Sequence, residues 1–235
     1  MKLPQSRPTT PLGRHFSKRL SEHQFDKIPD ADSQSSLVQL FNKQANRLLE
    51  LGFDKHAPVN QEIFWTRIWK LKMFIKTIKP KKDCIPFLIV FPRKVFSLQK
   101  QAALLSIDCR DGSKSFNKDS FTDLPKIEIP YPPYLAVNIS LGDKFRGLPP
   151  KKAIKKFNGW WRKLLPLTIE EGFALATHFP ELINLRSVDL IGTRFRAEGV
   201  PGLIKNEEGL WISYRSVERG AHNRSPAFCH KRIST

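Results

Sequence analysis

The segment 151–163 concentrates basic side chains that can bind phosphate or carboxylate groups. It reads KKAIKKFNGWWRK and contains no acidic residue. If the chain is helical from Pro150 to Leu165, with about 100° between successive residues, the basic residues share one arc of about 140°. They are Lys151, Lys152, Lys155, Lys156, Arg162 and Lys163. The opposite arc carries Ala153, Ile154, Phe157, Trp160, Trp161, Leu164 and Leu165. The pattern predicts a helix with one buried side and one cationic stripe.

Repulsion within the cationic stripe destabilises the helix that carries it, so the stripe calls for an explanation. Lys151 and Lys155, like Lys152 and Lys156, are like charges at i, i+4, and such pairs repel by about 0.2–0.5 kcal/mol each. Three ligands fit the stripe: the backbone of nucleic acid, an anionic membrane surface and an acidic protein. The alternative is a solvated face in a generally basic protein.

Residues that could support catalysis are few and distant in the sequence. Cys109 follows Asp108 near the end of an expected strand, and His178 lies in a later helix. A nucleophilic site would need these groups within hydrogen-bonding reach. A charged His178 at the end of its helix would instead favour the helix dipole, as Glu170 and Glu171 would at its start. Because G-x-S-x-G and glycine-rich phosphate loops are absent, the sequence favours a binding protein over an enzyme.

The cysteine and histidine residues do not form a metal-binding motif. The nearest group is His222, Cys229 and His230, with Cys84 or Cys109 as a fourth ligand. Adjacent residues such as Cys229 and His230 do not easily point at one ion, and no C-x-x-C accompanies them. Three cysteines also cannot form a complete set of disulfides, which favours a reducing cytoplasm. We therefore expect no metal, no cofactor and a cytoplasmic protein.

A second basic segment, 61–79, combines lysines with aromatic residues. As a helix it has a broad apolar face, while Trp65, Trp69 and Met73 form a separate stripe at i, i+4 and i+8 beside Lys72 and Lys76. The tryptophan rings could stack on single-stranded bases or lie among lipid headgroups. We favour the alternative, in which the stripe is a second packing surface of the helix.

The excess of positive charge is local. The chain has 40 Lys and Arg against 22 Asp and Glu, a formal net charge of +18. Residues 36–83 hold ten basic and four acidic groups (+6), and residues 148–166 hold six and none (+6). Residues 1–35 are polar, lack the apolar core of a signal peptide, and are expected to form a disordered leader. The longest apolar run, 85–91, is too short to span a bilayer.

Residues 36–233 are expected to form one α+β domain, with helices before and between two groups of strands in a short mixed sheet. The first helix covers 37–51, with Ser35 or Ser36 as N-cap and Gly52 at its end. The second covers 61–79, before Pro80. The basic helix comes third, and a fourth runs from Thr168 to Pro180, opened by a capping box with Glu171. Strands are expected at 85–91, 102–108, 134–140, 187–195, 200–204 and 210–214.

Several of these segments occur in an order found in a known family. They are IPFLIVF (85–91), YLAVNIS (134–140), PLTIEEGFALATHFPEL (166–182), SVDLIGTRF (187–195), and VPGLI with GLWIS (200–213). Over about residues 40–233, the chain resembles an uncharacterised bacterial domain of unknown function, mainly from actinobacteria. The resemblance implies the fold class and the domain boundary, but no activity. The chain departs from it in SYRSVERGAHNRSPAFCHKRI (213–233), where the family tends to a Trp- and Gly-rich segment with an N-P-H stretch.

Together these observations predict a non-enzymatic binding protein whose cationic helix contacts a polyanion such as nucleic acid. One alternative is an interaction protein, exported to act on acidic proteins or anionic membranes. The other is an enzyme of unknown class, with a cleft around Asp108, Cys109 and His178. The sequence does not indicate the oligomeric state.

Overall fold

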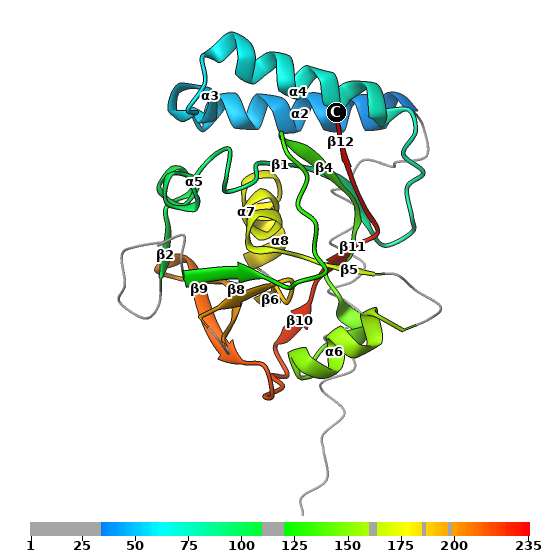
Figure 1. Cartoon of the computed structure of the whole chain (residues 1–235), viewed down its shortest axis with the longest axis vertical. Helices are drawn as coiled ribbons and strands as arrows, with labels where there is room; N and C mark the ends of the chain where they lie inside the picture. Colours follow the sequence, from blue (N-terminus) through cyan, green and yellow to red (C-terminus); the bar gives the residue numbers. More distant parts are fainter. Residues whose placement is uncertain (1–33, 110–119, 160–163, 185–186, 197–198) are drawn as a thin grey trace, which may run out of the picture.

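Figure 1 shows the computed structural model of the chain, which describes residues 34–109, 120–159, 164–184, 187–196 and 199–235. Its elements surround one helix, α7 (Ile169–His178), in which all ten residues are buried. A helix without an exposed face belongs in the interior of a protein. The elements that pack most extensively against it are α2 (Gln34–Glu50), β1 (Ile85–Val90), α5 (Leu98–Leu105) and α8 (Pro180–Asn184).

A layer of helices covers one face of a three-stranded antiparallel sheet (Figure 1). The layer contains α2, α3 (Phe53–His56) and α4 (Gln61–Ile75). The sheet has the order β1, β4 (Tyr134–Ile139), β12 (Lys231–Ser234). Every residue of β1 and β4 is buried, because α2 packs on one face of this sheet and α7 lies on the other. Such continuous apolar strands are typical of a sheet that is covered on both faces.

A second, mixed sheet lies on the other side of α7 (Figure 1). Its strands are β2 (Ile107–Cys109), β3 (Phe121–Asp123), β6 (Ser187–Asp189), β7 (Thr193–Phe195), β8 (Gly199–Asn206), β9 (Gly209–Ser216) and β10 (Arg224–Pro226). β10 is parallel to β6 and β2 is parallel to β9, whereas the other pairs are antiparallel. The α+β class and the mixed sheet predicted from the sequence are therefore confirmed.

The remaining elements lie at the edge of this second sheet. A short 3-10 helix, η2 (Asp143–Phe145), precedes α6 (Pro150–Phe157), and β5 (Leu165–Pro166) pairs with β11 (Phe228–Cys229). Among the described helices, none combines the length and the hydrophobicity that a membrane crossing requires.

Several predicted ends and caps are confirmed. Gly52 has a left-handed backbone (φ 72°) directly after α2, a conformation that glycine adopts at little cost. The capping box between Thr168 and Glu171 is present at the start of α7. The predicted strands at 85–91, 134–140, 200–204 and 210–214 correspond to β1, β4, β8 and β9.

Two predicted strands are wrong. Residues 98–105 form α5 instead, because the Ser97 side chain accepts a hydrogen bond from Lys100 N and so caps a helix. Only the short β2 follows it. The single strand predicted at 187–195 is split into β6 and β7 by a turn at Gly192. A Cβ at Gly192 would lie 2.7 Å from the carbonyl oxygens of Pro166 and Leu167, so the close approach requires glycine.

The predicted basic helix is also too long. α6 ends at Phe157 with Asn158 as its C-cap, and Leu165 belongs to a strand. Asn158 and Gly159 are weak helix formers, which favours the end of the helix there. Similarly, α4 ends at Ile75 rather than at residue 79. Ser35 and Ser36 lie inside α2 rather than before its first residue. Residues 1–33 of the predicted leader lie outside the described residues.

The C-terminal segment, where the sequence departs from the family it resembles, is part of the core. β10 pairs with β6, β11 with β5, and β12 with β4, so this segment joins all three sheets. Phe228 and Cys229 are buried. No strand was expected after residue 214, because these strands have at most four residues and no clear alternation.

Candidate functional site

One face of α6 is fixed in a small hydrophobic cluster. Ala153 and Phe157 are fully buried there, together with Phe228. Phe145 of η2 makes edge contacts with both phenylalanines, at ring-centroid distances of 5.0 Å to Phe157 and 5.9 Å to Phe228. Because these contacts hold the apolar face inward, the opposite face of the helix is directed to solvent.

The outward face of α6 carries four exposed lysines: Lys151, Lys152, Lys155 and Lys156. Lys151 Nζ lies 2.6 Å from Glu218 Oε1, in an exposed ion pair of the kind that contributes little to stability. Within the described part of the chain, the other three lysines have no hydrogen bond or ion pair. The structure therefore places four of the six predicted basic residues on one face, and one of these four, Lys151, is paired with an acidic residue.

Another exposed cation, in η2, lies on the aromatic rings that anchor α6. Lys144 is exposed, and its Nζ lies 5.1 Å from the centre of the Phe145 ring and 5.5 Å from that of Phe228. The same rings pack against Phe157 of α6. Because these rings lie on the buried face of α6, the contacts of Lys144 do not place it among the lysines of the outward face. Arg162 and Lys163 lie outside the described residues.

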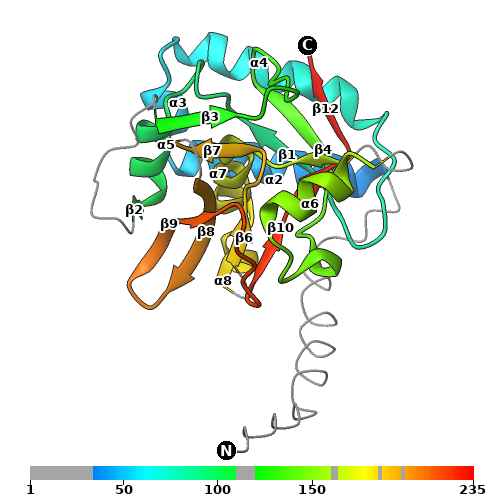
Figure 2. The same cartoon turned by 60° about the horizontal axis from the view of Figure 1, so that its bottom comes forward.

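The two tryptophans of α4 lie far from α6. Figure 1 places α4 at the top of the molecule and α6 near its lower end, and α4 also lies above α6 in Figure 2. Trp65 is half-buried and donates to Asp54 Oδ2 (3.3 Å). Trp69 is 45% exposed, packs against Phe41 (5.7 Å) and has Lys72 Nζ 5.1 Å from its ring centre. These rings therefore do not share a surface with the lysines of α6.

The structure does not join the residues considered for catalysis. Asp108 is exposed in β2, whereas His178 is buried at the end of α7, and no hydrogen bond connects the two side chains. The side chain of Cys109 lies outside what the structure describes. The described residues contain no group of three His, Cys, Asp or Glu arranged to hold a metal. Of the residues weighed as metal ligands in the sequence, His230 has its Nδ1 3.1 Å from Lys81 Nζ.

His178 is not the cation that the sequence predicted. Its Nε2 lies 3.1 Å from the carbonyl oxygen of Ile89 in β1. Burial, assisted by the charge of Arg47, lowers the pKa of His178 to about 4 against the effect of this hydrogen bond. The ring is neutral at physiological pH, so it does not act as a charge at the end of the helix dipole.

Glu170 and Glu171 are held by arginines from distant parts of the chain. Arg93 Nε donates to Glu170 Oε1 (2.5 Å), and Arg93 also bonds Asp123 (2.5 Å). Arg232 of β12 donates from Nε to Glu171 Oε1 (2.6 Å) and from Nη2 to Oε2 (2.9 Å). Burial raises the pKa of Glu170, and the charge of Arg93 opposes that rise. Both carboxylates are fully engaged, which fits a structural role for them.

A third buried carboxylate lies in the second sheet. Asp189 of β6 is fully buried, and its two carboxylate oxygens accept from Nε and Nη2 of Arg215 in β9. Arg224 of β10 lies 3.5 Å away and donates to Ser213 Oγ (2.6 Å). No sequence signal pairs these residues, since the partners are 26 and 35 positions apart along the chain. The strand order β10-β6-β8-β9 brings the two arginines to Asp189.

These features define an α+β protein with a buried central helix, three arginine–carboxylate networks and one cationic surface helix. The chain belongs to DUF5701, a family of unknown function, which matches residues 47–227. This confirms the resemblance to a domain of unknown function. No curated protein and no solved structure matches the chain.

Proposed function

We propose that this protein binds a polyanion through the lysine face of α6, and that the ligand is the phosphate backbone of nucleic acid. The observation that carries the proposal is the group Lys152, Lys155 and Lys156. These exposed lysines have no acidic partner among the described residues, on a helix whose other face is fixed in the core. Uncompensated cations held on a rigid helix are suited to phosphate contacts.

The spacing of these lysines supports contact with a backbone rather than with bases. Lys152 and Lys156 are one helical turn apart on the exposed face of α6. Binding is therefore expected to be insensitive to base sequence and strongly dependent on salt.

The test is binding to labelled duplex DNA and to single-stranded RNA over a series of salt concentrations. The test variant carries Lys152→Glu, Lys155→Glu and Lys156→Glu, which leaves the Lys151–Glu218 pair intact. Each phosphate contact contributes about 0.9 to the salt slope on duplex DNA, so the loss of three contacts lowers the slope by about 3. The affinity should fall by a similar factor for unrelated sequences.

The matched control carries Lys70→Glu, Lys76→Glu and Lys79→Glu. These exposed lysines lie in or just after α4, outside α6, and the control changes the net charge by the same amount. If binding depends on α6, the control keeps most of the affinity. Equal losses in both variants would show that net charge alone attracts the ligand, and would refute the site on α6.

If neither nucleic acid binds near physiological salt, that part of the proposal is wrong. Vesicles of phosphatidylcholine with phosphatidylserine would then test an anionic membrane as the ligand of the same lysines. We also propose a cytoplasmic location, supported by the free thiols of Cys84 and Cys229. Fractionation of cells that produce the tagged full-length chain would test it.

A further inference from the structure

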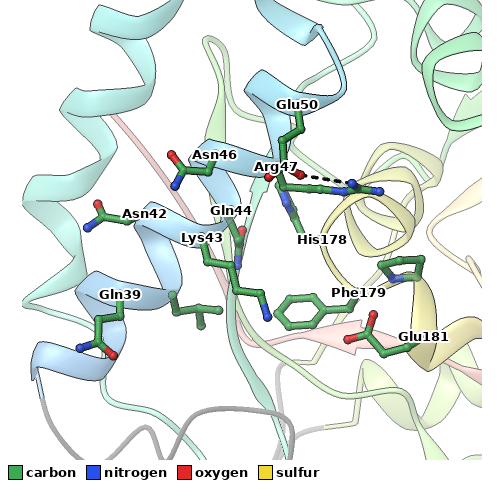
Figure 3. Close-up of a pocket in the computed structure, with 12 residues that line it drawn as sticks. Gln39, Asn42, Lys43, Gln44, Asn46, Arg47, Glu50, His178, Phe179 and Glu181 are labelled. Atoms are coloured by element: carbon green, nitrogen blue, oxygen red, sulfur yellow. Dashed lines mark hydrogen bonds and ion pairs between the residues drawn. The ribbon is translucent and has the colours of Figure 1, made fainter.

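A groove separates α2 from the junction of α7 and α8, on a part of the molecule that the proposed function does not use (Figure 3). Its volume is about 560 Å³, within the range of sites that hold small molecules. One wall is the polar face of α2, with Lys43 and Arg47. The other wall contains His178, Phe179 and Glu181.

His178 contributes an acceptor that has no partner among the described residues. Its Nε2 must donate to the carbonyl oxygen of Ile89, which only accepts, so Nδ1 of the neutral ring carries a lone pair. The side chain is about nine-tenths buried, and Nδ1 forms no hydrogen bond. A buried polar atom without a partner is unfavourable, and each such atom calls for an explanation.

Arg47 lies beside this ring in the groove and is only weakly held in place. It donates from Nε to the carbonyl oxygen of Thr177 (3.4 Å) and from Nη1 to Glu50 Oε2 (3.3 Å), and its side chain is 42% exposed. Both distances exceed those of good hydrogen bonds. A rotation of the Arg47 side chain would therefore open the ring of His178 to the groove at little cost. Figure 3 shows Arg47 extending across the groove beside His178.

Two opposite charges in the groove also lack partners in the described part of the chain. Lys43 is exposed and extends from α2 toward Phe179, and Glu181 lies on the opposite wall in α8 (Figure 3). Neither forms a hydrogen bond or an ion pair with a described residue. The groove thus presents a cation, an anion and a buried acceptor, none of which has a partner among the described residues.

We infer that this groove binds a small zwitterion of the amino-acid class, either a free amino acid or a short peptide. The carboxylate of such a ligand suits Lys43 and a displaced Arg47, its ammonium group suits Glu181, and an N–H suits Nδ1 of His178. A simple anion would face Glu50 and Glu181, and a simple cation would face Lys43 and Arg47. Only a ligand with both charges satisfies all three groups.

The probe is triglycine, a zwitterion with amide N–H groups and no side chains, added to the full-length protein labelled with ¹⁵N at histidine. The chemical shift of ring nitrogens reports directly whether Nδ1 of His178 accepts a hydrogen bond. Binding with a Kd of about 1 mM is expected for so small a ligand. N-acetyl-triglycine lacks the ammonium group, and triglycine amide lacks the carboxylate. Each should bind about fivefold more weakly or worse.

Two variants test the named groups. His178→Gln places an amide N–H near the position of Nε2 and so keeps a donor for Ile89, while it removes the acceptor Nδ1. Lys43→Gln removes the cation. Each should weaken triglycine binding about five- to tenfold. The matched control, Lys70→Gln, changes an exposed lysine outside the groove and should bind as the natural protein does.

The inference is overturned if triglycine leaves the Nδ1 resonance of His178 unmoved at about 10 mM, ten times the expected Kd. It is also overturned if the two capped peptides bind as well as triglycine, or if His178→Gln, once shown to be folded by circular dichroism, binds with unchanged affinity. Should His178→Gln fail to fold, the resonance of the natural protein still decides. None of these results depends on whether α6 binds nucleic acid.

Discussion

Lowering the pH should destabilise this protein through His178. The folded ring has a pKa of about 4, whereas an unperturbed histidine titrates at 6.5. Between these values the unfolded chain binds a proton that the folded chain does not, so stability falls as the pH falls. The full difference corresponds to about 3 kcal/mol, of which about 2 kcal/mol is lost at about pH 5. Above pH 6.5 the contribution of His178 is constant.

The assay is urea unfolding at about pH 7.5 and about pH 5, with His178→Gln in parallel. Burial raises the pKa of Glu170 and of Asp189, and such carboxylates add stability as the pH falls, which has the opposite sign. Because the variant retains both carboxylates, the difference between the two proteins isolates His178. The natural protein should lose about 2 kcal/mol more than the variant. If both proteins lose the same free energy, His178 is not the buried neutral ring described above.

Three further predictions concern the core. Arg232→Met should lower the free energy of unfolding, measured in urea, by about 3–5 kcal/mol, because it leaves the buried carboxylate of Glu171 unpaired. Adding Glu171→Gln to this variant should restore much of the lost free energy. Phe157→Ala should cost about 3–5 kcal/mol in the same measurement, since it empties the centre of the cluster that anchors α6. Burial raises the pKa of Cys229 far above that of a free thiol, so iodoacetamide should modify Cys229 only after unfolding, whereas half-buried Cys84 should react earlier. Peptide mapping by mass spectrometry would show which cysteine is modified. Modification of Cys229 in the folded protein, or of Cys229 before Cys84, would contradict this prediction.

Local signals in the sequence predicted the parts of the fold that depend on neighbouring residues. The capping box at Thr168 and the glycine stop at Gly52 are such signals, and both occur where expected. The apolar runs of β1 and β4 were also recognisable, because both faces of these strands are buried. The lysines of α6 were placed on one exposed face, although the helix proved to be half as long as the periodicity indicated.

Contacts between residues that are distant in the sequence could not be predicted from local sequence patterns. The sequence of α7 did not predict that Glu170 and Glu171 lie in the core. Carboxylates are rarely buried unless they are paired, and here their partners are arginines that are distant in the sequence. Arg93 and Arg232 lie 77 and 61 positions away from these partners. The neutral state of His178 likewise depends on β1, whose Ile89 is 89 positions away. The walls of the groove come from α2 and from the junction of α7 and α8, which are distant in the sequence, so the sequence did not predict the groove.

The contacts at the two ends of the family match indicate that the folded unit is larger than residues 47–227. Before the match, Gln44 of α2 donates to Phe87 O (2.8 Å) and accepts from Ile89 N (2.9 Å), which ties α2 to β1. After it, β12 completes a sheet with β4, and Arg232 neutralises Glu171 in the central helix. A chain cut to 47–227 would lose both and leave a buried carboxylate without its partner. We therefore expect limited proteolysis to yield a stable fragment close to residues 36–233. A fragment that ended near residue 227 and kept full stability would refute this reasoning.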